Sequence, residues 1–306
     1  MVRPAAFGFN EETAGTNRFQ AAPAASAQDV ARQALSEFDA AASAIRGAGV
    51  EVIVVGDLPQ PRTPDAVFPN NWISTHHDGT LVLYPMFAPL RRLERRLEVI
   101  ERLREEFDVR RIVDFGPNEE KGRFLEGTGS IVFDHRNRTA YAVLSPRTHR
   151  GMLLEAGELF GHEVVVFHAT GASGEDVYHT NVVMSVGERF AIVCAEAVDD
   201  PGERGRVLAR LNSTGREVLE VTRPQMSSFA ANVLELRSSA GEPVLAASER
   251  AWNALTGEQQ DGLGSLARVV TASIPTIESV GGGSLRCMIA EIFLLPSDRR
   301  APAAIA

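Results

Sequence analysis

The chain has 306 residues, a mass of 33.1 kDa and a formal net charge of −9 at neutral pH. Its apolar fraction of 44% and charged fraction of 23% are typical of a globular chain, and its acidic balance argues against nucleic acid as a partner. The first residues, MVRPAAFGFNEET, lack the apolar core of a signal peptide, and no run approaches the ~18 apolar residues of a membrane span. We therefore expect a cytoplasmic protein without a membrane partner. At about 150 residues per domain, the length alone predicts two domains.

The N-terminal region contains three predicted pieces: the strand-like AAFGFN, a helix over 27–47 and the strand-like VEVIVV. The order strand, strand, helix, strand follows. FPNNWIST and LVLYPM flank a turn that contains Asp-Gly, which favours a β-hairpin. Apolar residues at helical spacing predict a helix over 90–107, and VRRIVDF follows it as a strand.

The same order of elements occurs three more times. The second unit begins with the hairpin GSIVFDHRNRTAYAVLS, the third with TNVVMSVGERFAIVCAEAV and the fourth with the weaker ANVLELRSSAGEPVLAAS. Helices are predicted in RTHRGMLLEAGELFG, over 201–211 and within 251–266, and the strands HEVVVFHA, REVLEVT and RVVTAS follow them. The units open near Phe68, Leu125, Tyr178 and Ala230, at intervals of about 52 to 57 residues that are typical of stacked or radial modules.

A fifth module is expected to be split across the two ends of the chain. It would join the N-terminal pieces to a strand predicted over 288–295, MIAEIFLL, and a ring closed in this way leaves no free sheet edge there. The sequence therefore predicts the α/β class: a five-bladed, pseudo-symmetric propeller of ββαβ modules in one domain over 1–296, with a loose tail over 297–306. The alternative is an ordinary two-domain α/β protein, because alternating strands and helices also predict parallel sheets.

Residues able to do chemistry recur where the modules open. Asn70 and Asn71 open the first unit, Glu126 the second, His179 and Asn181 the third, and Cys287 the C-terminal half-module. Equivalent positions of a radial array converge at one end of its axis. We therefore expect these side chains to share one pocket.

Cys287 is the candidate nucleophile. It follows three glycines, which permit a tight loop, and Arg286 beside it can lower the pKa of the thiol. A thiolate near a histidine can act by covalent catalysis, and the alternative is a buried cysteine that starts a core strand. Cys194, in FAIVCAEA, has mostly apolar neighbours and is interpreted as packing. Two cysteines form no disulfide framework, which favours a reducing compartment.

His179 is the candidate proton carrier. It is two residues from Asn181, so in a strand both side chains would face the same way. Histidine suits proton transfer near neutral pH, and the alternative is a capping or turn histidine. The pair His76-His77 lies in a predicted hairpin tip without a cysteine or carboxylate cluster at ligand spacing, so no metal site is predicted.

Glu126 and Asp65 are the candidate carboxylates. A carboxylate can grip a planar group with N–H donors through two parallel hydrogen bonds. The alternatives are a strand-edge acid for Glu126 and a solvated turn acid for Asp65. No nucleotide cofactor is predicted, because a strand follows Gly-Thr-Gly-Ser and the loop at 281–284 lacks the Lys-Ser/Thr of a phosphate loop.

Four motifs in this order, PDAVFPNNWIS, FLEGTG, YHTNVVMSVG and GGGSLRCMIAEIF, resemble the guanidino-modifying (amidinotransferase and deiminase) superfamily. More narrowly, the chain is similar to its citrulline-utilisation hydrolase branch, often labelled arginine-deiminase-related, over almost its whole length. The resemblance implies the five-bladed pentein fold and no metal or organic cofactor. It also implies that Cys287 is the nucleophile, His179 the general acid/base and Glu126 the carboxylate that orients the planar head group. Asp65 or the Asn70-Asn71 pair would complete the grip.

This chain departs from the classical deiminases at two positions, where the amides Asn71 and Asn181 replace carboxylates. An amide both donates and accepts, so it can satisfy a neutral ureido group, whereas a cationic guanidinium prefers carboxylates. The expected substrate is therefore a small ureido or guanidino compound, with citrulline favoured. Citrulline would be hydrolysed to ornithine, ammonia and carbon dioxide through a covalent cysteine adduct. Arg286 is the residue expected to hold the substrate carboxylate.

Other functions are left open by the sequence. An arginine or methylarginine deiminase or dihydrolase would use the same residues, and an amidinotransferase would pass the group to an amine. A non-enzymatic pentein, such as the translation factor that blocks ribosomal subunit joining, would have no reason to place Cys, His and Glu at equivalent openings. A homo-oligomer is also compatible with the sequence.

Overall fold

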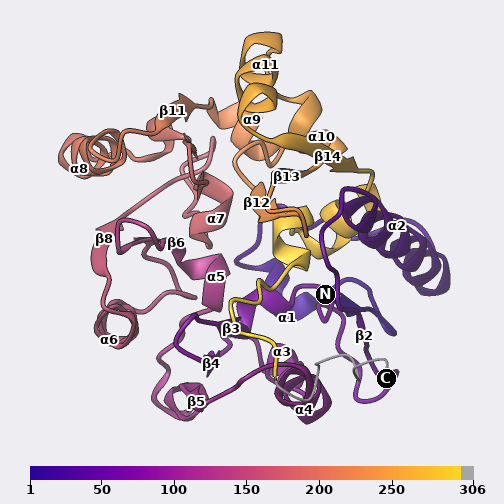
Figure 1. Ribbon diagram of the computed structural model, residues 1–306. Coiled ribbons are helices and arrows are strands. Elements are labelled where there is room, and N and C mark those ends of the chain that lie inside the picture. The colour runs from indigo at the N-terminus through magenta and orange to yellow at the C-terminus, as the bar shows by residue number, and fades with distance from the viewer. Residues whose placement is uncertain (298–306) are drawn as a thin grey trace, which may run out of the picture.

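Four three-stranded sheets surround a common centre in the computed structural model, which describes residues 1–297 (Figure 1). In each sheet the first two strands are antiparallel and the third is parallel to the second. The strands are β3 (Ile73–Thr75), β4 (Thr80–Leu83) and β5 (Arg111–Asp114); β6 (Val132–Asp134), β7 (Thr139–Val143) and β8 (Glu163–Phe167); β9 (Met184–Val186), β10 (Phe190–Val193) and β11 (Glu217–Glu220); and β12 (Leu234–Arg237), β13 (Pro243–Ser248) and β14 (Arg268–Ala272). β3, β6, β9 and β12 face the centre, where residues of all four line one cavity.

Helices supply the crossovers that parallel strand pairs require. They are α3 (Pro89–Arg92) and α4 (Leu97–Glu106) in the first unit, α6 (Arg150–Phe160) in the second, α8 (Pro201–Asn212) in the third, and α10 (Glu249–Asn253) with α11 (Gly257–Leu266) in the fourth. Figure 1 shows α4, α6, α8 and α11 at the periphery of the ring. This order confirms the predicted ββαβ repeat, with α9 (Arg223–Ser227) between the third and fourth units.

The fifth part of the ring contains α2 (Ala27–Gly47), whose bounds match the predicted helix. The Ser26 hydroxyl caps this helix by accepting the Asp29 N–H. Its buried face is formed by Val30, Ala34, Phe38, Ala41 and Ile45. Leu285 and Met288 belong to the same hydrophobic cluster as this face, so segments from the two halves of the chain pack together here.

The prediction of strands in this fifth part is largely wrong. In the C-terminal segment, Glu291 C=O and Phe293 N–H bond to the Thr75 hydroxyl at 3.1 and 2.8 Å instead of to a neighbouring backbone. Residues 288–295 therefore run beside β3 without forming a strand. In the N-terminal region, β1 (Val2–Arg3) precedes AAFGFN, and it pairs in parallel with β2 (Val55–Gly56), which contains only the last residue of VEVIVV.

The predicted helix over 90–107 is interrupted between α3 and α4. Arg95 and Arg96 form ion pairs there with Glu119 and Asp57, and the Arg96 backbone is extended, with φ −88° and ψ 134°.

No helix within residues 1–297 is long and apolar enough to cross a membrane. Apart from Ser297, the tail predicted over 297–306 lies outside the described residues.

Candidate active site

The residues just ahead of the inner strands meet at the centre of the ring. η1 (Pro69–Asn71) precedes β3, α5 (Gly127–Ser130) precedes β6 and α7 (Thr180–Val183) precedes β9. α5 contacts both η1 and α7, and η1 contacts η5 (Leu285–Met288), the turn that carries Cys287. Gly127 permits the close approach of α5 to η1, because its φ is +45° and a Cβ there would overlap the Asn70 carbonyl oxygen.

Cys287 is buried, with 4% of its surface exposed. The Nδ2 atoms of Asn181 and Asn232 lie 3.6 and 3.5 Å from its Sγ, and Asn232 also donates to the Asn181 carbonyl at 2.8 Å. Burial raises the pKa of the thiol, and the Ser284 backbone, Arg286 and the two amides only partly oppose this shift. The resting cysteine is therefore a neutral thiol surrounded by amide donors that can stabilise a thiolate.

Glu126 and His179 form a buried pair, with His179 Nε2 2.8 Å from Glu126 Oε2. Burial would raise the pKa of Glu126, but Arg147 at 3.5 Å, His179 and Arg91 at 3.9 Å outweigh it and hold this pKa at about 2. Burial lowers the pKa of His179 to about 4 despite the neighbouring carboxylate. Near neutral pH the ring is therefore uncharged. Its Nε2 carries the proton that Glu126 accepts, and Nδ1 is the basic atom.

This pairing differs from the expectation that Glu126 grips a head group. Both carboxylate oxygens are engaged, since Oε1 accepts the Phe87 N–H at 3.1 Å and Oε2 accepts the His179 proton. The side chain is fully buried. Glu126 therefore orients His179 and fixes its tautomer. The free Nδ1 of His179 lies close to Gly129 and Asn71. A Cβ atom placed on Gly129 would be 2.7 Å from this Nδ1 and would overlap the Asn71 amide.

The expectation that His179 and Asn181 share a strand is wrong. His179 has an extended backbone, but Asn181 lies in the helical turn α7. The Thr180 hydroxyl anchors this turn by donating to the Ser130 carbonyl at 2.5 Å and accepting the Val143 N–H at 2.7 Å. The two side chains nevertheless reach the same site, where His179 meets Glu126 and Asn181 meets Cys287.

A cavity of about 20 Å³, room for about one water molecule, lies beside Cys287 and His179. The polar side chains that line it with them are Thr13, Asn17, Asp65, Asn71, Arg91, Arg147 and Tyr178. An amino acid cannot enter a space of this size unless part of the wall moves.

The segment with α1 (Glu11–Ala14) supplies one wall of this cavity through Thr13 and Asn17. Asn17 Nδ2 donates to the Gly282 carbonyl at 3.2 Å. Arg147 Nη2 donates to the Thr13 carbonyl at 3.2 Å and to the Thr16 hydroxyl at 2.7 Å. These hydrogen bonds close the cavity, and all of them can break without unfolding a sheet.

Asp65 and Asn71 bring unsatisfied polar atoms to the cavity. Asp65 Oδ2 accepts the Asn10 amide at 2.7 Å, and burial raises the pKa of this carboxyl against the effect of Arg91. Asn71 Oδ1 accepts from Arg91 Nη1 at 2.8 Å. Within the described residues, Asp65 Oδ1, Asn71 Nδ2 and Asn181 Oδ1 are buried without a hydrogen-bond partner.

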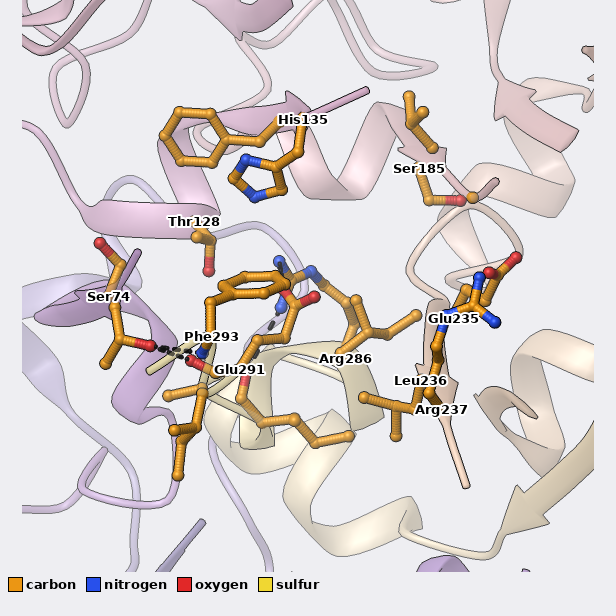
Figure 2. A pocket seen from close by; sticks show the side chains of 18 of the residues that line it. Ser74, Thr128, His135, Ser185, Glu235, Leu236, Arg237, Arg286, Glu291 and Phe293 are labelled. Atoms are coloured by element: carbon orange, nitrogen blue, oxygen red, sulfur yellow. Dashed lines mark hydrogen bonds and ion pairs between the residues drawn. The ribbon is translucent and has the colours of Figure 1, made fainter. Parts of the chain in front are cut away.

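Two residues predicted to bind substrate do not line this cavity. Asn70 is fully buried, and its side chain has no hydrogen-bond partner within the described residues and does not line the cavity. Arg286 lines a second, larger cavity of about 760 Å³ instead (Figure 2). Arg286 neighbours Cys287 in sequence but faces another space, and its contact with the substrate carboxylate stays a prediction.

Three site residues were missed in the sequence. Asn232 could have been identified from the sequence pattern, because it lies at the opening of the fourth unit, just as Glu126 and His179 open theirs. Arg91 and Arg147 could not have been identified in this way, since they occupy α3 and the loop after β7. Arg147 also lies over the Tyr178 ring, with 4.7 Å from its guanidinium carbon to the ring centroid.

No cluster of three or more His, Cys, Asp or Glu side chains within residues 1–297 is arranged to hold a metal ion.

The ring of ββαβ units, with cysteine, histidine and glutamate brought together by its inner turns, defines an α/β propeller of the pentein class. The family model described as "N,N dimethylarginine dimethylhydrolase, eukaryotic" matches residues 3–294. The chain belongs to this family. No curated protein matches the chain.

Solved structures share the fold at low sequence identity. The N-terminal domain of ArgZ with bound substrate, an arginine dihydrolase from cyanobacteria, is 14% identical with a TM-score of 0.71, and the match covers 96% of this chain and 98% of that one. DDAH from Pseudomonas aeruginosa in complex with citrulline is 17% identical with a TM-score of 0.61, and the match covers 97% of each chain.

Longer relatives are matched only in part. AgrE with L-arginine is 15% identical with a TM-score of 0.71, and the match covers 95% of this chain. This chain spans 40% of the AgrE chain and 40% of the longer, apo form of ArgZ. These likenesses establish the pentein fold, which confirms the predicted fold class, and they leave the citrulline-utilisation branch as a prediction.

Proposed function

We propose that this chain is a cysteine-dependent hydrolase of a carbon–nitrogen bond in an amino acid with a guanidino or ureido head group, with 1–296 as its catalytic domain. The observation that carries the proposal is the shared cavity of Cys287 and His179, in which amides contact Sγ and Glu126 fixes the histidine tautomer. The family, whose description refers to dimethylarginine, supports the same class of substrate. The structural neighbours that hold L-arginine and citrulline support it too.

Cys287 attacks the central carbon of the head group and forms a carbon–sulfur bond. His179 Nδ1 takes the thiol proton and delivers it to the nitrogen whose bond to that carbon breaks. Glu126 stabilises the imidazolium that forms between these two transfers. In the second half of the reaction, the same Nδ1 takes a proton from the water molecule that attacks the adduct. The carbon–sulfur bond then breaks, and Nδ1 returns this proton to the sulfur, which regenerates the thiol.

The cavity also offers groups for holding the substrate. Arg147 is suited to the α-carboxylate, because opening of the Thr13–Asn17 segment frees the donors that Thr13 and Thr16 now occupy. Asp65 Oδ1 and Asn181 Oδ1 have acceptor capacity for N–H groups of the head group. Asn71 Nδ2 has donor capacity.

Citrulline is the finer proposal for the substrate. Asn71 Nδ2 is an unpartnered donor within the described residues, and it needs an acceptor. The ureido carbonyl is an acceptor, whereas a guanidinium has donors only. Attack of the Cys287 thiol on citrulline would release ornithine and leave a carbamoyl adduct. One water would then hydrolyse this adduct to the free thiol, ammonia and carbon dioxide.

Arginine is the second candidate, and the raised pKa of Cys287 favours it. A cationic head group beside the sulfur promotes loss of the thiol proton, and a neutral ureido group does not. An arginine dihydrolase would form the same carbamoyl adduct. It would consume two waters and release two ammonia molecules for each ornithine.

Product analysis with citrulline, arginine and dimethylarginine as separate substrates tests these proposals. Equal amounts of ornithine and ammonia from citrulline, with arginine inert, support citrulline hydrolysis. Ornithine with twice as much ammonia from arginine supports the dihydrolase. Citrulline as the final product of arginine or dimethylarginine, or a new amidino compound when glycine is added, would replace both proposals. A folded protein that consumes none of the three would contradict the enzyme proposal.

A further inference from the structure

The second cavity, of about 760 Å³, lies in the central channel, and its size falls in the range of about 300 to 1,000 Å³ typical of small-molecule sites. Residues of β3, β6, β9 and β12 line it together with the segment after η5 (Figure 2). Thr128 of α5 and Arg286 of η5 also border it. The turns that carry Glu126 and Cys287 on the catalytic side therefore form the wall between the two cavities.

Arg286 is a buried cation whose pairing is weak. It is 6% exposed, and it donates to the Ile289 carbonyl at 3.3 Å and to Glu291 Oε2 at 3.4 Å. Charge-assisted bonds of this kind are usually about 2.7 to 2.9 Å long. The guanidinium has five N–H donors, so it can accept an additional anionic partner.

Two carboxylates of the same cavity are also only weakly paired. Burial raises the pKa of Glu291, and Arg286 is the one group that opposes this shift. Burial raises the pKa of Glu235 as well, against the opposing effects of Arg189 and Arg216, and its hydrogen bond within residues 1–297 is with the Glu188 N–H at 3.2 Å. Two other acids that line the cavity differ, because Asp134 pairs with Arg216 at 2.7 Å and Glu188 pairs with Arg237.

The Ser185 hydroxyl is a further polar group of this cavity without a partner among residues 1–297. It is 8% exposed, lines the cavity and has no hydrogen-bond partner within the described residues (Figure 2). Burying unpartnered polar groups is costly, so a cavity with a weakly paired cation, two weakly paired carboxylates and a free hydroxyl fits a ligand of matching polarity. A simple anion would leave the carboxylates unpaired, and a simple cation would leave Arg286 unpaired.

We propose that this cavity binds a basic α-amino acid, with its α-carboxylate on Arg286 and its side-chain cation on Glu235. The α-ammonium group replaces Arg286 as the partner of Glu291. Leu236 and Ile289, which also line the cavity, contact the methylene groups of the ligand. The assignment is independent of turnover at Cys287, so it does not rest on the proposed function.

Calorimetric titration with L-ornithine tests this site. Glu235→Gln keeps the shape of the side chain and removes its charge, so ornithine is expected to bind about tenfold more weakly. Glu188→Gln is the matched control, because Glu188 lines the same cavity but already pairs with Arg237, and it should bind ornithine as the wild type does. L-Leucine, which lacks the distal cation, and putrescine, which lacks the carboxylate, are each expected to bind at least about tenfold more weakly than ornithine.

Equal ornithine affinities of the wild type and Glu235→Gln would overturn the proposal, since binding would then lie elsewhere. A crystal structure of the wild-type protein with L-ornithine provides a readout that needs no variant. Ornithine between Arg286 and Glu235 is the expected result. Ornithine only beside Cys287, or at neither cavity, would overturn the proposal while leaving the proposed hydrolase reaction untouched.

Discussion

The two cavities differ in how tightly the protein pairs one charged residue beside each of them, Glu126 near the small cavity and Arg286 at the large one. Around Glu126, contacts of 2.8 and 3.1 Å engage both carboxylate oxygens, and the open volume is about 20 Å³. Around Arg286, the contacts are 3.3 and 3.4 Å and the open volume is about 760 Å³. Tight hydrogen bonds hold reacting groups in place before a substrate arrives, whereas a weakly paired ion remains available to a ligand. The first region is thus suited to bond breaking and the second to reversible binding.

The largest expected effect is loss of the nucleophile. Cys287→Ala should reduce kcat/KM by more than about 10⁴-fold, because the covalent route disappears. Cys194→Ala is the matched control: this thiol is also buried, but it directly follows β10 in an apolar cluster and should be dispensable. Ammonia release measures both variants, and circular dichroism checks their fold. Similar activity of the two variants would show that the small cavity is not the reaction site.

Glu126→Gln should lower kcat by about 10²-fold, because the amide no longer holds the Nε2–H tautomer or stabilises the imidazolium. KM should change little, since Glu126 has no oxygen free for a substrate. Glu119→Gln is the control, because Glu119 pairs with Arg92 and Arg95 outside the cavity. Steady-state kinetics separates the two parameters. A large rise in KM at constant kcat would restore Glu126 as a substrate ligand.

Gly129→Ala should lower kcat/KM by about tenfold or more, because a Cβ there would overlap the Asn71 amide and lie 2.7 Å from His179 Nδ1. Gly205→Ala in α8 is the control, since a Cβ at that position meets nothing within 4 Å. The control should keep full activity and gain slight stability from the better helix former. Thermal unfolding and kinetics of both variants check this, and an unimpaired Gly129→Ala enzyme would argue against a tightly arranged site.

Asn17→Ala should give the smallest effect, a faster reaction of Cys287 with iodoacetamide by about threefold to tenfold. The variant loses the hydrogen bond from Asn17 to the Gly282 carbonyl, a bond worth about 1 kcal/mol, so the closing segment opens more often. Glu11→Ala, an exposed position on α1, is the control. Mass spectrometry follows alkylation at each cysteine. An unchanged rate would mean that the reagent reaches Cys287 by another route.

The repeat could be predicted from the sequence because hairpins and helices leave local periodic patterns. The rule that chemistry lies at module openings also extends to Asn232. Arg147 could not be found in this way, because its partner Thr13 lies 134 residues away and no local pattern connects them. The cavity that Arg286 faces could not be predicted either, because neighbours on a 3₁₀ turn project about 120° apart, so adjacency to Cys287 does not place both side chains in one cavity.

The spacing of the catalytic groups along the chain has a consequence for how the protein matures. Glu126 and His179 are 53 residues apart, Asn232 and Cys287 are 55 apart, and Asn181 and Cys287 are 106 apart. Such separations match one or two repeats, so each contact forms only when neighbouring modules dock, which is slow compared with local folding. During synthesis the histidine and its carboxylate can meet early, but the nucleophile joins them only when the ring closes. A partly made chain therefore carries no assembled reactive centre, and closure of the ring is the moment at which the chemistry becomes available.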